Sequence, residues 1–157
     1  EIHGLLVADG KVFAYGRCAV TSMNDWDPFV VAHDAASGAE LYSSPYDLGS
    51  NEIFLSASYD STKGQLLLGG VGGWSQNPDG VSVTEDGTKL LVVVDSRSGE
   101  VAEAIVQGNG PRQNQIRSVM RLSGGKLLVA GWENGPGTHS GDSDPGLVTA
   151  DGFLDVR

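Results

Sequence analysis

The sequence predicts an all-β chain of 157 residues in which one four-stranded antiparallel unit occurs three times. The first observation is a pattern of a turn glycine, a polar residue, a short apolar or aromatic strand and a closing glycine. This pattern occurs at Gly10–Gly16, Gly64–Gly70 and Gly125–Gly131. The second observation is an apolar strand that ends in Asp and is followed by Ser-Gly, as at Asp34 and Asp95. No stretch keeps an apolar period of 3.6 residues, so we expect essentially no helix.

The spacings of the two markers agree with each other. The closing glycines, at positions 16, 70 and 131, recur after 54 and then 61 residues. The strand-ending aspartates, at positions 34, 95 and 151, recur after 61 and then 56 residues. This period predicts units of about 1–50, 51–111 and 112–157, which together form a single region over residues 1–157.

Each unit is expected to hold four short strands, as the enrichment in Val, Leu, Ile and Tyr favours. The first strands are expected at Gly4–Ala8, Ile53–Tyr59 and Ile116–Leu122, and the second lie between the paired glycines. The third strands end at Asp34, Asp95 and Asp151, and the fourth are expected at Ala39–Ser43, Val101–Gln107 and Phe153–Val156. Because Asp can cap its own turn and Gly adopts positive φ, the link from the third strand to the fourth predicts a tight hairpin.

Four antiparallel strands repeated every 50–60 residues are typical of the blades of a β-propeller. The alternative is a β-sandwich of many short strands, which leaves the repeat unexplained. Since a closed propeller has ~4–8 blades, three blades are expected to belong to a longer propeller or to be completed by another copy. Glu1 is not an initiator Met, so we expect the chain to be a processed or excised piece.

The segment Lys89–Val101 resembles the blade unit of quinoprotein-like and YVTN-type β-propellers. Asp27–Gly38 and Gly64–Gly70 also resemble bacterial seven-bladed propeller repeats. The resemblance extends over nearly the whole chain, one blade at a time, and implies a fold rather than an activity. The three tryptophans are scattered and do not form the repeated Trp docking motif of quinoproteins, which argues against a quinone cofactor.

Charge and motif content exclude several classes of function. Ten Lys and Arg against twenty Asp and Glu give a net charge of −10, which repels nucleic acids and anionic membranes. No apolar run approaches the ~20 residues of a membrane span. Cys18 is the single cysteine, so no internal disulfide or Cys-based zinc cluster forms. The chain has no His-Glu-x-x-His or Gly-x-Ser-x-Gly motif, and Gly69–Gly73 opens no helix as a phosphate-binding loop would.

The links between second and third strands carry acidic pairs, namely Asp25 and Asp27 in the first unit and Asp142 and Asp144 in the third. Asp-x-Asp spacing can direct two carboxylates to one Ca²⁺ ion. The favoured interpretation is that these residues stabilise turns and lie in water, because a full calcium loop with a terminal Glu is missing. Calcium is therefore the only metal to consider, and no other cofactor is expected.

Trp26, Trp74 and Trp132 fall in or beside the same class of loop. Exposed aromatic rings stack against sugars or anchor protein partners, whereas buried ones pack over the end of their own blade. Together these features predict a non-catalytic propeller module, extracellular or periplasmic, that binds a protein or carbohydrate or is a structural building block of an assembly. The alternative is a fragment of a propeller enzyme, quinoprotein dehydrogenase-like or lactonase-like. We expect further blades as partners, but neither nucleic acid nor a membrane span.

Overall fold

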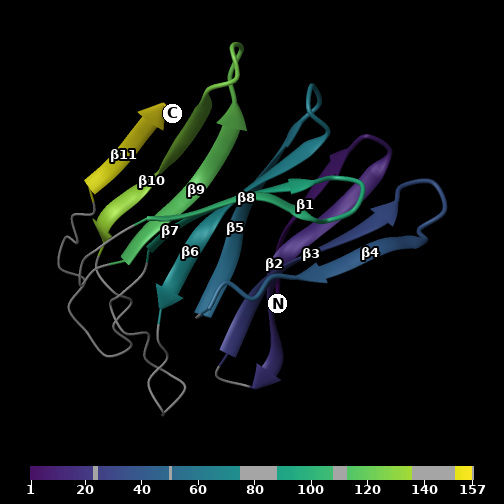
Figure 1. Ribbon diagram of the computed structural model, residues 1–157, viewed down its shortest axis with the longest axis horizontal. Coiled ribbons are helices and arrows are strands. Elements are labelled where there is room, and N and C mark those ends of the chain that lie inside the picture. Colours follow the sequence, from purple (N-terminus) through teal and green to yellow (C-terminus); the bar gives the residue numbers. More distant parts are fainter. Residues whose placement is uncertain (23–24, 50, 75–87, 108–112, 136–150, 157) are drawn as a thin grey trace.

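The computed structural model describes residues 1–22, 25–49, 51–74, 88–107, 113–135 and 151–156. Within these ranges the backbone forms eleven β-strands and no helix, which confirms the all-β prediction. The strands form three separate antiparallel sheets that follow one another along the chain (Figure 1). In this part of the chain, no helix exists that is long and apolar enough to cross a membrane.

The strands of each sheet lie side by side in chain order, each antiparallel to its neighbour. Sheet 1 contains β1 (Ile2–Ala8), β2 (Lys11–Ser22), β3 (Asp25–Asp34) and β4 (Glu40–Pro45). Sheet 2 contains β5 (Asn51–Asp60), β6 (Gln65–Trp74), β7 (Thr88–Asp95) and β8 (Val101–Gln107). Sheet 3 contains β9 (Gln113–Arg121), β10 (Leu127–Gly135) and β11 (Asp151–Val156).

The prediction that Phe153–Val156 forms the fourth strand of the third unit is wrong. These residues belong to β11, which pairs directly with β10 and so takes the place of a third strand. The reason is local, because Asp151 is followed at once by Gly152 and an apolar residue, without the Ser-Gly that closes the other two turns. The strand therefore runs on through Asp151. Residues 146–150, expected as part of the third strand, lie outside the described residues.

The two Asp turns have the predicted structure. The Oδ1 atoms of Asp34 and Asp95 each accept hydrogen bonds from the backbone N–H groups two and three residues ahead, at 2.7 to 3.2 Å. Gly38 and Gly99 both adopt φ of 74°, in the left-handed region where a side chain would be strained. The hairpin predicted between the third and fourth strands is thus confirmed for sheets 1 and 2.

The three closing glycines occupy the same structural position. Each lies opposite the first strand of its own sheet, next to an irregularity in the pairing register. A Cβ atom at Gly16, Gly70 or Gly131 would overlap a backbone carbonyl oxygen of that first strand. These oxygens belong to Glu1, Ile53 and Gln115. Glycine is therefore required by close backbone approach, and not by a turn.

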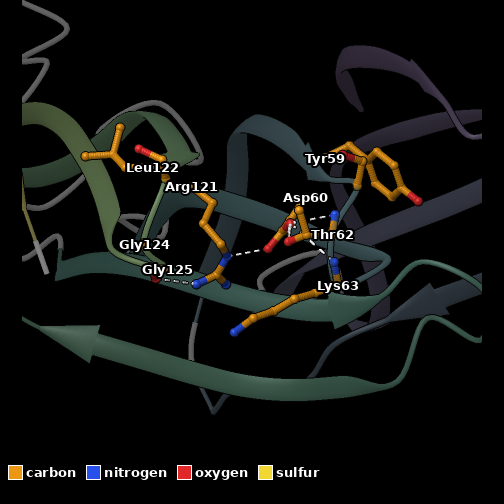
Figure 2. Close-up of a pocket in the computed structure, with 10 residues that line it drawn as sticks. Tyr59, Asp60, Thr62, Lys63, Arg121, Leu122, Gly124 and Gly125 are labelled. Atoms are coloured by element: carbon orange, nitrogen blue, oxygen red, sulfur yellow. Dashed lines mark hydrogen bonds and ion pairs between the residues drawn. The ribbon is translucent and has the colours of Figure 1, made fainter.

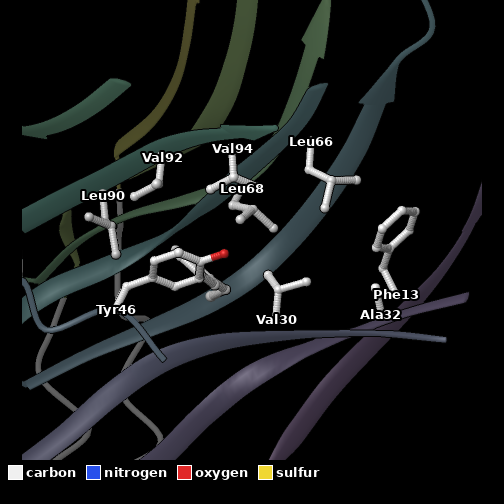
Figure 3. Close-up of a cluster of buried hydrophobic side chains, with 10 residues drawn as sticks. Phe13, Val30, Ala32, Tyr46, Leu66, Leu68, Leu90, Val92 and Val94 are labelled. Carbon is white, nitrogen blue, oxygen red and sulfur yellow. The ribbon is translucent and has the colours of Figure 1, made fainter. Parts of the chain in front are cut away.

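The core lies between the sheets, and sheet 2 is apolar on both faces. Alternate residues of a strand point to opposite faces. One set from sheet 2 packs with sheet 1 (Figure 3), and this cluster contains Phe13, Val30, Ala32, Tyr46, Phe54, Leu66, Leu68, Leu90, Val92 and Val94. The intervening set packs with sheet 3, and that cluster contains Leu67, Leu91, Val93, Ile116, Val119, Leu127 and Val129. Full burial of each Leu, Ile, Val or Phe side chain in these clusters stabilises the fold by about 1.5–3 kcal/mol.

Candidate functional site

A pocket of about 280 Å³ lies where a turn of sheet 2 meets a turn of sheet 3. Its walls are the link between β5 and β6 and the link between β9 and β10 (Figure 2). Both links contain glycines with positive φ, 64° at Gly64 and 93° and 87° at Gly124 and Gly125. The pocket is thus built from tight turns at the ends of packed strands, which hold its side chains on a rigid base.

Asp60 and Arg121 form an ion pair across the two sheets. The Nε atom of Arg121 contacts Oδ2 of Asp60, and the two side chains are only 14% and 3% exposed. Arg121 also donates from Nη1 to the carbonyl oxygen of Gly125 at 2.8 Å, which holds the guanidinium in place. Figure 2 shows the two charged groups pointing toward each other from β5 and β9. The pair therefore fixes the floor of the pocket.

One oxygen of the Asp60 carboxylate, Oδ1, is occupied by its own turn. Oδ1 accepts hydrogen bonds from the Thr62 hydroxyl at 2.6 Å and from the N–H groups of Thr62 and Lys63 at 3.0 and 3.3 Å. Burial raises the pKa of Asp60, but the hydrogen bonds from Thr62 and Lys63 and the charge of Arg121 outweigh it, so the pKa is lowered. Asp60 is therefore ionised at neutral pH and is not available as a base.

Lys63 adds a second positive charge to the pocket. Its side chain is exposed and lies on the same side as the Arg121 guanidinium in Figure 2. Among the described residues, no ion pair engages the Lys63 ammonium. The lining therefore holds the Asp60–Arg121 ion pair and one further cation, Lys63, in a chain whose net charge is −10. Such a site favours an anionic group.

The structure places Trp26 in a strand rather than in a loop. The expected loop is wrong from Asp25 onward, because the β2–β3 pairing continues past the closing glycine with Ala19 opposite Trp26. The ring is half-buried, packs against Ile53 and Val71, and has the Arg17 guanidinium 4.6 Å from its centre. The backbone N–H of Trp26 donates to the side chain of Asn51 at 2.8 Å. These contacts are with sheet 2, so the ring packs on the neighbouring sheet.

Asp25 and Asp27 are strand residues of β3, so their expected place in an exposed turn is wrong. Asp27 is only 4% exposed and lies opposite Cys18. Burial, followed by the nearby charge of Asp27, raises the pKa of the Cys18 thiol. Asp142 and Asp144 lie outside the described residues, as does the side chain of Asp25. Within the described part of the chain, no group of three or more Asp, Glu, His or Cys side chains is placed to hold a metal ion.

Trp74 is the last residue of β6, and Trp132 lies within β10. Their side chains lie outside the described residues. Trp74 pairs with Asn51, whose side chain binds the backbone of Trp26, so the strand positions of these two tryptophans meet at one end of sheets 1 and 2. The pocket lies at the other end of β5. The structure therefore does not bring the predicted tryptophans to the pocket.

Sequence reasoning missed Asp60, Lys63 and Arg121. The Asp60–Gly64 segment carries a usable signal, since Asp followed by Thr and Gly within four residues predicts a self-capped turn. Nothing local links that turn to Arg121, which lies 61 residues further along. Their contact exists only because β9 packs on sheet 2.

The fold and the pocket define an all-β protein of three packed antiparallel sheets with a cation-bearing pocket between two turns. No protein-family model matches the chain, and no curated protein matches it.

Proposed function

We propose that the three sheets are consecutive blades of a β-propeller and that the chain is a non-catalytic module that binds carboxylate groups of a protein or carbohydrate partner. Several features support the propeller. Each four-stranded sheet is antiparallel in chain order, successive sheets pack face to face, and the closing glycine meets its first strand in the same way in all three. Propellers are radial arrays of sheets of this kind.

The observation that carries the binding function is the pair of cationic groups at the pocket. Arg121 is held by Asp60 and Gly125, and the Lys63 ammonium stands beside it without an ion-pair partner among the described residues. Arg and Lys form charge-assisted hydrogen bonds with carboxylates, and the ligand would replace water at both groups. The occupied Asp60 carboxylate supports binding rather than catalysis at this pocket.

The test compares binding of two immobilised probes, a polyglutamate peptide and an array of uronic-acid and sialylated glycans. Lys63→Gln is expected to weaken binding of the recognised probe by about tenfold, since a hydrogen bond to a charged group contributes ~1.5 kcal/mol or more. Lys126→Gln is the matched control, because Lys126 is equally exposed and follows Gly125 but does not line the pocket.

Three results separate the outcomes. Selective loss with Lys63→Gln identifies the pocket, and the probe that responds identifies the class of partner. Equal loss with both lysine variants shows a general charge effect and refutes the site. Absence of binding of either probe by the unmodified chain refutes carboxylate recognition.

A further inference from the structure

The two faces of sheet 2 define two kinds of surface. We call the side of each sheet that faces the preceding sheet its front face, and the opposite side its back face. In sheet 2, Leu66 and Leu68 lie on the front face against sheet 1, and Leu67 lies on the back face against sheet 3. In sheet 3, Leu127 and Val129 lie on the front face. The two largest buried clusters in the described part of the molecule therefore each join a back face to a front face.

Pairing registers show which residues of sheet 1 form its front face. Ile2 lies opposite closing glycine Gly16, as Phe54 lies opposite Gly70 and Ile116 opposite Gly131. Phe54 and Ile116 are 0% and 4% exposed because each packs on the preceding sheet. Ile2 is 63% exposed.

Two further residues of β1 repeat this contrast. Leu5 and Val7 lie three and five residues after Ile2 in the sequence. Ala57 and Tyr59 lie three and five residues after Phe54. Ala57 and Tyr59 pack against the core between sheets 1 and 2, whereas Leu5 and Val7 are 66% and 70% exposed. The front face of sheet 1 thus has the apolar residues of a sheet-to-sheet contact, but none of the described strands packs on it.

Sheet 3 carries the complementary surface. On its back face, Leu128 lies three residues before the closing glycine of its sheet. Phe13 in sheet 1 and Leu67 in sheet 2 have the same position, and each is buried against the next sheet. Met120, which pairs with Leu128, is 48% exposed. Among the described strands, the back face of sheet 3 therefore lies at one end of the three sheets and the front face of sheet 1 at the other, each without a further sheet of these strands on it (Figure 1).

We infer that the back face of sheet 3 in one copy of the chain packs on the front face of sheet 1 in a second copy. The contact between the two copies is inferred from these faces alone. That two such contacts close into a ring depends on the proposed propeller. Two such contacts, one in each direction, join two copies into a ring of six sheets, within the ~4–8 blades of closed propellers.

The test is the mass of the chain in solution, measured by sedimentation equilibrium over a wide concentration range. The unmodified chain is expected at twice 16.4 kDa, without growth to larger species. The double variant Leu5→Lys, Val7→Lys disables the front face, and Met120→Lys disables the back face. Ala36→Lys, in an exposed turn away from both faces, is the control that keeps the dimer.

Mixing distinguishes the kinds of pairing. Each face variant alone is expected to be monomeric, and an equal mixture is expected to form one-to-one pairs, because each variant supplies the face that the other lacks. Circular dichroism checks that each variant keeps its strands. The inference is overturned if the unmodified chain is monomeric at all concentrations. It is also overturned if Met120→Lys leaves the dimer intact, because sheet 1 of one copy would then pair with sheet 1 of the other. Growth into longer chains would retain the face pairing but refute closure, and with it the proposed propeller curvature.

Discussion

Substitution of a closing glycine tests whether close backbone approach, rather than turn geometry, explains these positions. In Gly70→Ala the new methyl group would lie 2.9 Å from the carbonyl carbon of Ile53 and 3.1 Å from the Cα of Phe54, and closer still to the Ile53 oxygen. Carbon atoms in contact normally stand ~3.5–4.0 Å apart. Because the obstacle is backbone at the centre of the core, no side-chain rotation relieves it.

The expected cost of Gly70→Ala is about 3 kcal/mol, the upper part of the usual range for overpacking. For a chain of this size, that corresponds to a fall of roughly 6–12 °C in the melting temperature. Thermal unfolding followed by circular dichroism measures it. Gly72→Ala is the matched control on the same strand, since its methyl group would meet only the Glu52 and Thr88 side chains, at 3.2 and 3.4 Å.

The control is expected to change stability by less than about 1 kcal/mol, because flexible side-chain atoms can move by a few tenths of an ångström. Equal melting temperatures for Gly70→Ala and Gly72→Ala would refute the explanation. The same explanation extends to Gly131, where the contacting atoms of β9 lie at the same distances of 2.9 and 3.1 Å.

Two further predictions concern buried polar contacts. Arg121→Met removes the partner of Asp60 and should destabilise the fold by about 3 kcal/mol in urea unfolding at pH 7, whereas Arg121→Lys should cost less. Because folding lowers the pKa of Asp60, the stabilisation from the ionised carboxylate is present above about pH 4 and is lost as the pH falls through the folded pKa. The difference in unfolding free energy between Arg121→Met and the unmodified chain should therefore disappear in acid. A difference that stays constant with pH would contradict this. Tyr46→Phe removes a buried hydrogen bond of 2.9 Å to the Gly99 carbonyl and should cost about 1 kcal/mol, and an unchanged unfolding midpoint would show that this bond contributes nothing.

Much of the fold follows from the sequence because strands, turns and closing glycines are local. The Asp34 and Asp95 turns depend on residues within five positions, and both form as expected. The link before Pro28 was harder to predict, since Asn and Asp ahead of Pro favour a turn. There the strand continues because Trp26 gains contacts with Ile53 and Val71 from sheet 2, which no local pattern reveals.

The candidate site follows much less from the sequence. Exposed acidic pairs and tryptophans are reasonable candidates, but their exposure depends on where a strand stops. Asp27 is buried because β3 begins at Asp25. The pocket depends instead on Arg121, which ends the first strand of sheet 3, and on Asp60, which faces it from sheet 2. How the two sheets pack decides that these residues meet.

The two sheet-to-sheet junctions share a geometry but differ in chemistry. At the end of β5, Tyr59 of sheet 2 reaches Asp9 of sheet 1. The pKa of Asp9 is lowered mainly by the hydrogen bond and charge of Lys11, and also by the hydrogen bond from Tyr59. At the end of β9, Arg121 of sheet 3 reaches Asp60 of sheet 2. At the first junction the side chain that comes from the following sheet is a neutral phenol, and Asp9 pairs with Lys11 of its own sheet. At the second junction the side chain from the following sheet is a guanidinium, which pairs with Asp60 itself.

The corresponding position in β1 is Val7, which is 70% exposed. One strand position thus carries three kinds of side chain: Tyr59 in a polar contact, Arg121 in an ion pair that lines the pocket, and Val7 as an exposed apolar residue. Because the backbone position is the same, replacing its side chain changes the chemistry of a junction without changing the sheets that form it.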